Sequence, residues 1–376
     1  MLAMNISTLP TPTALVDERR MQHNIQRMQS RVSDLGARLR PHVKTAKCLA
    51  VAQQQLAAGA QGITVSTLKE AEVFFDAGIH DILYAVCIVA PKLAQARALR
   101  ERGCQLTVVL DSVAAAQAVV DSGHQFDVMI EIDTDGHRAG VLPDSELLLQ
   151  IGRVLQFGGV VLRGVMTHAG ASYDCRSPAA LQAMAEQERS RCVRAAERLR
   201  AAGLPCPEVS VGSTPTALSA KSLAGVTEVR AGVYVFQDLV MQGVGVCQTQ
   251  EVALSILCTV IGHQLAKGWV LVDAGWMAMS RDRGTQGQDV DYGYGAVCDE
   301  AGELIEGLLM SSANQEHGIL SWRDGHDSAD LVQQFPVGTR LRVLPNHACA
   351  TAAQFPHYDV LGANGRLDRW ERFYGW

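Results

Sequence analysis

Long apolar runs, a basic excess and an export signal are all missing from this sequence. Its most apolar stretches, VALSILCTVIG and VLVDAGWMAM, are well short of the roughly 18 apolar residues of a membrane-spanning helix. The 33 lysines and arginines stand against 39 acidic residues, so the net charge of −6 offers no basic surface to nucleic acid. The opening MLAMNISTLPTPTALVD lacks a basic segment followed by an apolar one, which a secretory signal would have. We therefore expect a cytoplasmic protein with neither a membrane nor a nucleic-acid partner.

Lysine is also scarce, with six lysines against 27 arginines. Chemistry that needs a primary amine is thus limited to Lys44, Lys47, Lys69, Lys92, Lys221 and Lys267. The ten cysteines include no C-x-x-C pair, and without an export signal we expect them to be reduced and mostly buried. Hydrophobic residues make up 48% of the chain and charged residues 19%, a balance that excludes intrinsic disorder.

The chain of 376 residues is long enough for two domains, or for one large barrel with an appendage. From about residue 38, runs rich in β-branched residues alternate with amphipathic stretches that end in glycine. The runs are apolar almost throughout, as parallel strands covered on both faces should be. There are eight of them, which predicts an α/β fold of the (β/α)8 TIM-barrel type, with a doubly wound open sheet as the alternative. The runs are 39–44, 62–67, 81–86, 105–111, 127–133, 162–170, 208–214 and 228–236.

After about residue 245 the pattern changes to strand-like segments separated by turn residues instead of long helices. This predicts an additional C-terminal all-β domain. The early segment TALVD (13–17) could pair into it, which would make that domain discontinuous. We expect a barrel over 18–245 and a β domain formed by 1–17 and 246–376. The strand-like segments are 252–264, 268–280, 291–300, 305–320 and 337–349.

Barrel enzymes carry their active sites at the carboxyl ends of the strands, so the residues there are the first candidates. Pyridoxal phosphate needs an amine, donors for its phosphate, a group near its ring oxygen and a flat side chain against its ring. Each residue also has a plainer reading: Lys44 as a solvated lysine with Lys47 as its rival, Arg138 as a partner of Asp135, His168 as a core histidine, and VGSTPT as an ordinary turn. The candidates are Lys44, Arg138, His168, Tyr173, Gly212, Ser213, Thr214 and Tyr234.

A second candidate site is the LPNHACAT segment, where His347 and Cys349 stand two residues apart. Residues i and i+2 of a strand share a face, so an imidazole and a thiolate could bind one divalent cation there. Two protein ligands leave coordination positions for water and substrate. Glu316 and His317 in NQEHG could support these ligands. As a bare motif, His-x-Cys is also compatible with chance and core packing.

Taken in order, RPHVKTAK, ITVSTLKEAE, DTDGHRAGV, THAGASY, VGSTPT, EVRAGVYVF, DAGWMAMSRDRG, NQEHG and PNHACAT form a specific set. With these motifs the chain resembles the fold-type III pyridoxal phosphate enzymes related to alanine racemase, in the branch of D-serine dehydratase and D-threonine aldolase. The resemblance implies a barrel plus a β domain, paired as a homodimer. It implies that Lys44 carries the cofactor, that Gly212, Ser213 and Thr214 hold its phosphate with Tyr234 close by, that Arg138 lies near its ring oxygen, and that His168 and Tyr173 lie beside it.

By the same resemblance, His347 and Cys349 match the metal pair of the dehydratases, which is usually zinc, with Mn, Co, Ni or Mg possible. The implied reaction is elimination of water from a D-3-hydroxy amino acid, with D-threo-3-hydroxyaspartate going to oxaloacetate and ammonia. The second carboxylate of that substrate needs a further contact, for which Arg281, Arg283 and Gln315 are available. D-serine dehydratase and retro-aldol cleavage are the enzymatic alternatives, although the aldolase pattern has aspartate at the position of Cys349. A non-catalytic cofactor carrier is the alternative outside enzymes, but such carriers lack the stretch after 246.

Overall fold

The computed structural model describes residues 6–323, 328–362 and 365–376. The chain divides into two compact units. We call Gln26–Gly232 with Tyr374–Trp376 the barrel unit, and Met1–Ile25 with Val233–Phe373 the β unit. The division therefore falls at 25/26 and 232/233, whereas the sequence pattern placed it at 17/18 and 245/246. The first difference arises because α1 (Glu18–Asp34) is one continuous helix that contains the division point.

The barrel unit is built on eight parallel strands in the order β2-β9-β8-β7-β6-β5-β4-β3. A parallel bridge between His42 and Thr64 joins the two edges of this sheet, so the barrel is closed. Val43 N donates to Thr64 O at 2.9 Å and Thr64 N donates to Pro41 O at 2.8 Å. The predicted TIM barrel is thus confirmed and the open sheet is not. The strands are β2 (Arg38–Leu39), β3 (Ile63–Val65), β4 (Asp81–Cys87), β5 (Gln105–Leu110), β6 (Asp127–Glu131), β7 (Val161–Met166), β8 (Glu208–Val211) and β9 (Glu228–Val229).

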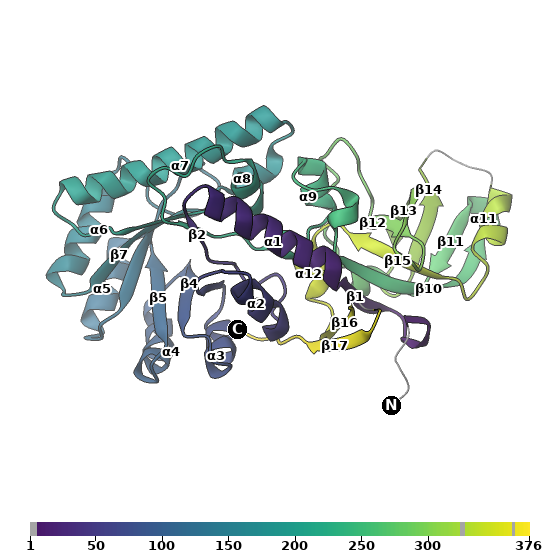
Figure 1. Ribbon diagram of the computed structural model, residues 1–376, viewed down its shortest axis with the longest axis horizontal. Helices are drawn as coiled ribbons and strands as arrows, with labels where there is room; N and C mark the ends of the chain where they lie inside the picture. Colours follow the sequence, from purple (N-terminus) through teal and green to yellow (C-terminus); the bar gives the residue numbers. More distant parts are fainter. Residues whose placement is uncertain (1–5, 324–327, 363–364) are drawn as a thin grey trace. The chain divides into compact units, whose positions relative to one another are not determined.

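Helices follow the strands and lie outside them (Figure 1). Many begin at a serine or threonine that caps the first turn, because a hydroxyl can accept from an amide that has no partner within the helix. Thr67 accepts from Glu70 N in this way, and Ser112 accepts from Ala115 N. The helices are α2 (Leu49–Ala57), α3 (Leu68–Asp76), α4 (Ala90–Glu101), α5 (Val113–Asp121), α6 (Glu146–Phe157), α7 (Pro178–Ala201) and α8 (Thr214–Ser219), with the 3-10 helix η2 (Gly170–Asp174).

The β unit contains a closed antiparallel barrel of six strands in the order β11-β14-β13-β12-β15-β10, with β10 pairing back to β11. On its other edge β10 pairs with β1 (Thr13–Asp17), and β1 runs parallel to β16 (His357–Leu361), which pairs with β17 (Leu367–Glu371). The early segment 13–17 therefore belongs to this sheet. The six strands are β10 (Leu254–Gln264), β11 (Trp269–Val272), β12 (Gly295–Cys298), β13 (Leu304–Ala313), β14 (Gly318–Trp322) and β15 (Arg340–Pro345).

Short helices connect these strands. They are η1 (Ile6–Thr8), η3 (Val233–Val235), α9 (Leu239–Val244), η4 (Thr249–Glu251), η5 (Leu265–Lys267), α10 (Trp276–Met279), α11 (Ser328–Gln334) and α12 (Ala348–Ala352). Two predicted strands therefore end early. The segment 228–236 is a strand only at β9 and then forms η3, and the segment 337–349 leaves its strand at Pro345 before α12 begins.

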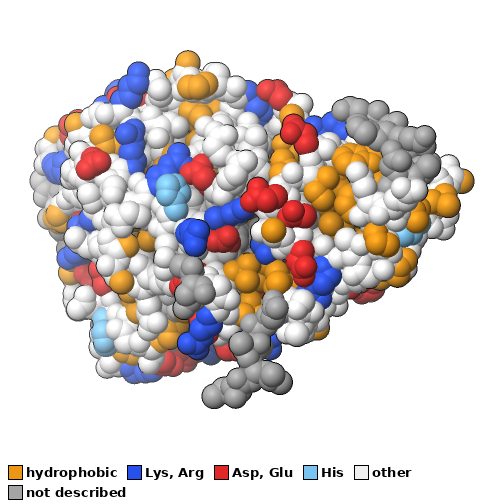
Figure 2. Space-filling model, turned by 45° about the vertical axis from the view of Figure 1, so that its right-hand side comes forward, with side chains coloured by type: hydrophobic (Ala, Val, Ile, Leu, Met, Phe, Trp, Pro, Cys, Tyr) orange, Lys and Arg blue, Asp and Glu red, His pale blue; other side chains and the backbone are white. Residues whose placement is uncertain are grey.

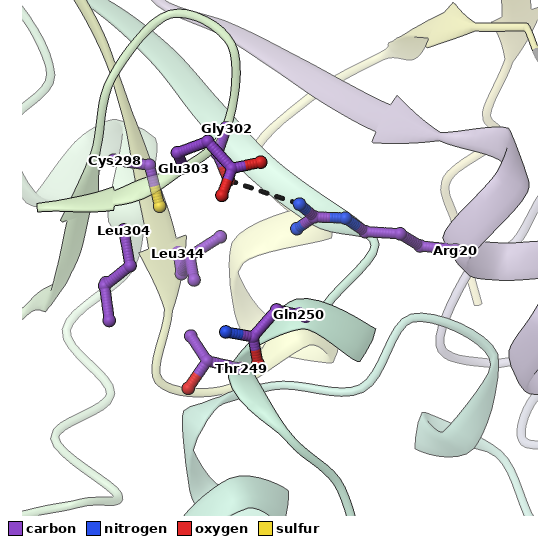
Figure 3. A pocket seen from close by; sticks show the side chains of 8 residues that line it. All are labelled: Arg20, Thr249, Gln250, Cys298, Gly302, Glu303, Leu304 and Leu344. Carbon is purple, nitrogen blue, oxygen red and sulfur yellow. Dashed lines mark hydrogen bonds between the residues drawn. The ribbon is translucent and has the colours of Figure 1, made fainter.

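Arg20, in the first turn of α1, ties two turns of the β unit together. Its guanidinium donates to Val252 O at 3.2 Å. It also donates to Gly302 O at 3.2 Å (Figure 3). A pocket of about 10 Å³ lies beside it, enough for roughly one water molecule. We read this pocket as a packing detail. Among the described residues, no helix combines the length and apolar character that crossing a membrane would need.

Candidate active site

Lys44 lies in the turn that follows the bridge closing the barrel, not at the end of a strand as its sequence position suggested. Its side chain is exposed, and it forms no ion pair or hydrogen bond with the described residues. The rival Lys47 differs in both respects. It is partly buried, and its Nζ lies 3.1 Å from Glu70 Oε1 and 5.7 Å from the ring centre of Trp376. Of the two amines, Lys44 is the one available for chemistry.

The charge of Lys44 acts on two imidazoles of the barrel unit, those of His42 and His168. Burial lowers the pKa of His168 to about 3, and Lys44 and Arg138 act in the same direction, while the bond to Gly212 opposes them. The Nδ1 of His168 lies 2.9 Å from Gly212 O, and since a carbonyl can only accept, Nδ1 carries the proton. Burial also holds the pKa of His42 well below its ordinary value. Both rings are therefore neutral at physiological pH.

His42 has a feature that sequence reasoning missed. Its Nδ1 is buried and has no hydrogen-bond partner among the described residues. The backbone that carries this ring is fixed, because His42 N donates to Ala231 O at 2.8 Å and Val43 N donates to Thr64 O at 2.9 Å. A buried polar atom without a partner is unusual in a native protein and indicates that something else supplies the partner.

The Gly212–Ser213–Thr214 segment joins β8 to α8. Gly212 has φ +140°, and a Cβ there would collide with the carbonyl of Arg230, so only glycine fits. Ser213 caps α8 in a reciprocal arrangement with Thr216, and its Oγ lies 2.8 Å from Ser172 Oγ. Three hydroxyl groups, those of Ser172, Ser213 and Thr216, thus gather at the carboxyl end of β8. Ser172 Oγ donates to Ala169 O at 2.7 Å here, so it would have to rotate away from that carbonyl to donate to an anion.

Glu188, in α7, holds this loop and was not anticipated. The side chain is buried, and its Oε1 accepts from Gly212 N at 3.1 Å and from Ala169 N at 2.9 Å. Ser213 N in turn donates to Thr216 Oγ1 at 3.1 Å. The two amide hydrogens at 212 and 213 are therefore donated within the protein, so the anion cradle expected from free amides relies in this structure on other groups.

Arg138 pairs with Glu131 and not with Asp135. Its guanidinium nitrogen lies 3.2 Å from Glu131 Oε1, whereas Asp135 accepts from Ala171 N at 2.9 Å. Tyr173, in η2, has its ring centre 6.2 Å from that of His168. Lys44, Arg138, His168, Tyr173 and Gly212–Thr214 all belong to the barrel unit, whereas Tyr234 lies in η3 of the β unit and is fully buried.

His347 and Cys349 lie at the start of α12, not on a strand. His347 precedes the helix with an extended backbone, φ −133° and ψ 106°, and Cys349 is in its first turn. The two side chains are nevertheless within hydrogen-bonding distance of each other. The described residues include no group of three or more His, Cys, Asp or Glu side chains placed to hold a metal ion, so any ion here would have this pair as its protein ligands.

Asp282 supports the pair and was missed between Arg281 and Arg283. Its Oδ2 lies 2.6 Å from His347 Nδ1, so Nε2 is the ring nitrogen that could bind an ion. Partial burial alone would lower the pKa of His347, but hydrogen bonds to Asp282 and Cys349 raise it to about 11. The bond to His347 lowers the pKa of Asp282, so both shifts favour the charged forms of the pair.

A second buried acid fixes the helix that carries the pair. Asp238 accepts from Ala348 N and from Met241 N, both at 2.9 Å, and so joins the starts of α12 and α9. Burial raises the pKa of Asp238 to about 6, although the neighbouring His347 and these two amides oppose the shift. Thr351 Oγ1 donates to Met279 O at 2.8 Å, which ties α12 to α10 as well.

The candidate substrate-binding residues differ in whether their side chains already contact other residues of the protein. Arg283 pairs with Asp291 at 2.9 Å and stacks on Tyr294, whereas Arg281 stacks on Trp276 at 4.5 Å and has no carboxylate partner among the described residues. Gln315 lies in the turn between β13 and β14, where its carbonyl accepts from Met277 N at 3.1 Å. Glu316 and His317 are in the same turn with exposed side chains.

Two family models match the chain. Residues 16–239 match the alanine racemase N-terminal domain, and residues 253–361 match the family described as "Putative serine dehydratase domain". The chain is 63% identical to the D-threo-3-hydroxyaspartate dehydratase of Delftia sp. (strain HT23), over 98% of both chains. It is 28% identical to the D-serine dehydratase of Dictyostelium discoideum, over 96% of both. A solved cysteine-to-alanine mutant of D-threo-3-hydroxyaspartate dehydratase in a metal-free form has 62% identity and a TM-score of 0.98, covering 99% of this chain and 100% of that one.

Proposed function

The chain belongs to the family of alanine racemase-like fold-type III enzymes that carry a serine dehydratase domain, and on that premise we propose its reaction. We propose a dehydratase, dependent on pyridoxal phosphate and a divalent metal, that converts D-threo-3-hydroxyaspartate to oxaloacetate and ammonia. The observation that carries this proposal is the 63% identity to a dehydratase of that specificity over the full chain. D-serine dehydratases are more distant relatives, so D-serine is the alternative substrate.

The barrel unit fits the cofactor on three observations. Lys44 presents an amine with no partner among the described residues, the hydroxyls of Ser172, Ser213 and Thr216 offer donors to a phosphate, and His42 keeps a buried Nδ1 without a partner. We assign cofactor attachment to Lys44, with Arg138, His168 and Tyr173 beside the ring and Gly212–Thr214 and Tyr234 at the phosphate.

The β unit fits a divalent ion through the chemistry of its donors. Imidazole and thiolate suit zinc, and Mn, Co, Ni or Mg are the other candidates. His347 and Cys349 would hold the ion, and the carboxylate of Asp282 would orient the imidazole. Two ligands from the protein leave positions for water and for the hydroxyl of a substrate.

In this scheme the bound cofactor supplies an electron sink for the α-carbanion, and the bound metal supplies a Lewis acid for the departing hydroxyl. The chain's own part is to move the proton and to orient the groups. Lys44 Nζ takes the α-proton of the substrate. We assign the distal carboxylate to Arg281, because its guanidinium is not paired to a carboxylate among the described residues, whereas Arg283 is paired with Asp291.

Product analysis tests the reaction. The holoprotein would be given a panel of D- and L-3-hydroxy amino acids, and ammonia, 2-oxo acid, glycine and aldehyde would be quantified with and without added zinc or manganese. We expect ammonia and oxaloacetate from D-threo-3-hydroxyaspartate in equal amounts. Glycine with an aldehyde would instead establish retro-aldol cleavage, and a preference for D-serine would replace the proposed substrate.

A pair of lysine variants tests the assignment of the amine. Lys44→Ala should abolish the visible absorbance of the bound cofactor, whereas Lys47→Ala, which removes an amine already paired with Glu70, should keep it. Loss of the band in Lys47→Ala and its survival in Lys44→Ala would reverse the assignment.

The proposal includes a homodimer located in the cytoplasm. Hydrophobic side chains gather on the face of the β unit seen in Figure 2, and exposed ones in that unit include Leu265 and Val337, which are 57% and 65% exposed. Clustered exposed apolar side chains are typical of a surface that binds another protein. Light scattering of the purified holoprotein should give twice the mass of 40.5 kDa, and a mass of one chain would contradict the dimer.

A further inference from the structure

Three successive strands of the barrel unit end in side chains that lie at one edge of the barrel, where Glu131 contacts Arg138. Cys87 ends β4, Asp111 follows β5, and Glu131 ends β6. Cys87 Sγ lies 3.3 Å from Glu131 Oε2, and the other oxygen of Glu131 lies 3.2 Å from Arg138. Apart from Arg138, none of these residues stood out in the sequence. Parallel strands bring their carboxyl ends to one edge, which explains why residues so far apart in the chain meet there.

Cys87 is a hydrogen-bond donor in this cluster, and Glu131 is its acceptor. Burial raises the pKa of the Cys87 thiol, and the carboxylates of Glu131 and Asp111 raise it further. The thiol is therefore protonated at physiological pH and donates to Glu131 Oε2. Glu131 is almost fully buried, with 5% of its side chain exposed, and it accepts from both Cys87 and Arg138. Its two oxygens are thus bound from opposite sides, which restricts how the carboxylate can turn.

Backbone and side-chain hydrogen bonds fix the loop that carries Arg138. Ile132 and Val141 form a bridge at its base, and Val141 N donates to Glu131 O at 2.9 Å. Gly140 N donates to Asp111 Oδ2 at 3.2 Å, so the strand β5 also holds the loop. The backbone at Arg138 is therefore well anchored, but its side chain is 52% exposed, and Glu131 is its ion-pair partner among the described residues.

From this arrangement we infer that Glu131 is a positioning residue, which holds the Arg138 guanidinium toward the ring oxygen of the cofactor, with the Cys87 thiol keeping Glu131 in place. An arginine side chain loses much rotamer freedom when it is fixed, so an unheld guanidinium would bind the cofactor less tightly. A buried carboxylate that already holds the guanidinium restricts it in the cofactor-free protein, so less side-chain entropy is lost when the cofactor binds. The inference rests on the proposed function, because it takes Arg138 to contact pyridoxal phosphate.

A double-mutant cycle on cofactor binding tests it. The dissociation constant of pyridoxal phosphate is measured from the visible band of the reconstituted full-length protein for Glu131→Gln, Arg138→Ala and the double variant. We expect each single variant to weaken binding about tenfold, the size of one hydrogen bond to a charged group. The double variant should be no more than about twofold weaker than Arg138→Ala, because Glu131 acts through Arg138. A loss of about a hundredfold in the double variant would show independent effects and overturn the inference.

Matched controls separate positioning from stability. Asp127→Asn breaks the ion pair of Asp127 with Arg100 at the opposite end of the same strand, and it should leave the cofactor affinity unchanged. Cys87→Ser keeps a donor and should bind the cofactor within about twofold of the parent, whereas Cys87→Ala should bind it less tightly. If Glu131→Gln does not fold, the cycle is run with Cys87→Ala and Arg138→Ala, and additivity there overturns the inference equally. If the parent protein itself fails to bind pyridoxal phosphate, the proposed function fails, which is a separate outcome.

Discussion

Replacing Asp282 by asparagine should weaken metal binding while leaving the fold intact. The carboxylate accepts from His347 Nδ1 at 2.6 Å, a distance typical of a strong charge-assisted hydrogen bond. Asparagine keeps the size of the side chain and an acceptor oxygen but removes the charge, so the imidazole keeps only a weaker neutral hydrogen bond and loses part of its basicity.

The expected loss is at the low end of the usual range. Loss of a carboxylate behind a metal-bound histidine typically costs about 10- to 100-fold in metal affinity. Here the side chains of His347 and Asp282 are 41% and 31% exposed, so water screens their interaction. In addition, Asp282 holds a proton on His347, and removing it reduces the competition between that proton and the metal. We therefore expect a loss of about tenfold, or about 1.4 kcal/mol.

Isothermal titration of the metal-free holoprotein with zinc, in buffers of different ionisation enthalpy, measures both affinity and proton release. Because hydrogen bonds to Asp282 and Cys349 raise the pKa of His347, we expect zinc binding at neutral pH to displace its proton, and the variant should release fewer protons than the parent. Asp291→Asn, which breaks the nearby pair with Arg283, is the control and should change neither quantity. An Asp282→Asn protein with unchanged affinity and unchanged proton release would refute the role given to Asp282.

Three further outcomes follow from other contacts. Gly212→Ala should lose cofactor binding and unfold at lower urea, because its Cβ would collide with the carbonyl of Arg230 at φ +140°; wild-type absorbance and stability in this variant would contradict the geometry. Prolonged chelation should stop turnover while the visible band of the cofactor remains, and full activity after verified metal removal would exclude the metal from the reaction. Burial opposes the charge of Glu228, but Arg40, whose Nε is 2.6 Å away, lowers the pKa of Glu228 below its ordinary value, so the ion pair stabilises the fold above the unfolded pKa of about 4.3 and this stabilisation is lost as pH falls through the lower folded pKa. Glu228→Gln should lower the free energy of unfolding in urea at neutral pH by about 3 kcal/mol and make stability less dependent on pH in the acid range. An unchanged pH dependence in the acid range would count against this role of Glu228.

The eight barrel strands could be predicted because a strand that is buried on both faces is apolar at successive positions of the sequence. In β6, for example, Val128, Met129 and Ile130 are all buried, so the run is apolar without alternation. The positions at which strands end were harder to predict. The segment VYV at 233–235 has the composition of a strand but forms η3, since Phe236 N and Gln237 N both donate to Val233 O. Local preference for a strand was overridden by contacts that composition does not record.

The metal pair was predicted for a reason that the structure corrects. On a strand, His347 and Cys349 would share a face, but both residues lie at the start of α12. Two positions apart within a helix they would point in different directions. They meet because His347 stands just outside the helix with an extended backbone, which turns its side chain back toward the first turn. The two side chains do meet, although the strand that was predicted to bring them together is wrong, and their role as metal ligands stays a prediction.

The acids that support the site could not have been found from the sequence, and the reason is physical. Asp282, Glu131, Glu188 and Asp238 are four among 39 acidic residues, and nothing in their neighbours separates them from the solvated ones. Asp282 even lies between two arginines, which would ordinarily be read as its partners, yet it bonds to His347, 65 residues later. Folding brings each of these acids to a donor, and it removes Glu131, Glu188 and Asp238 from water while Asp282 stays 31% exposed. That change depends on tertiary contacts alone, so such residues are recognised by what the carboxylate holds as well as by its burial.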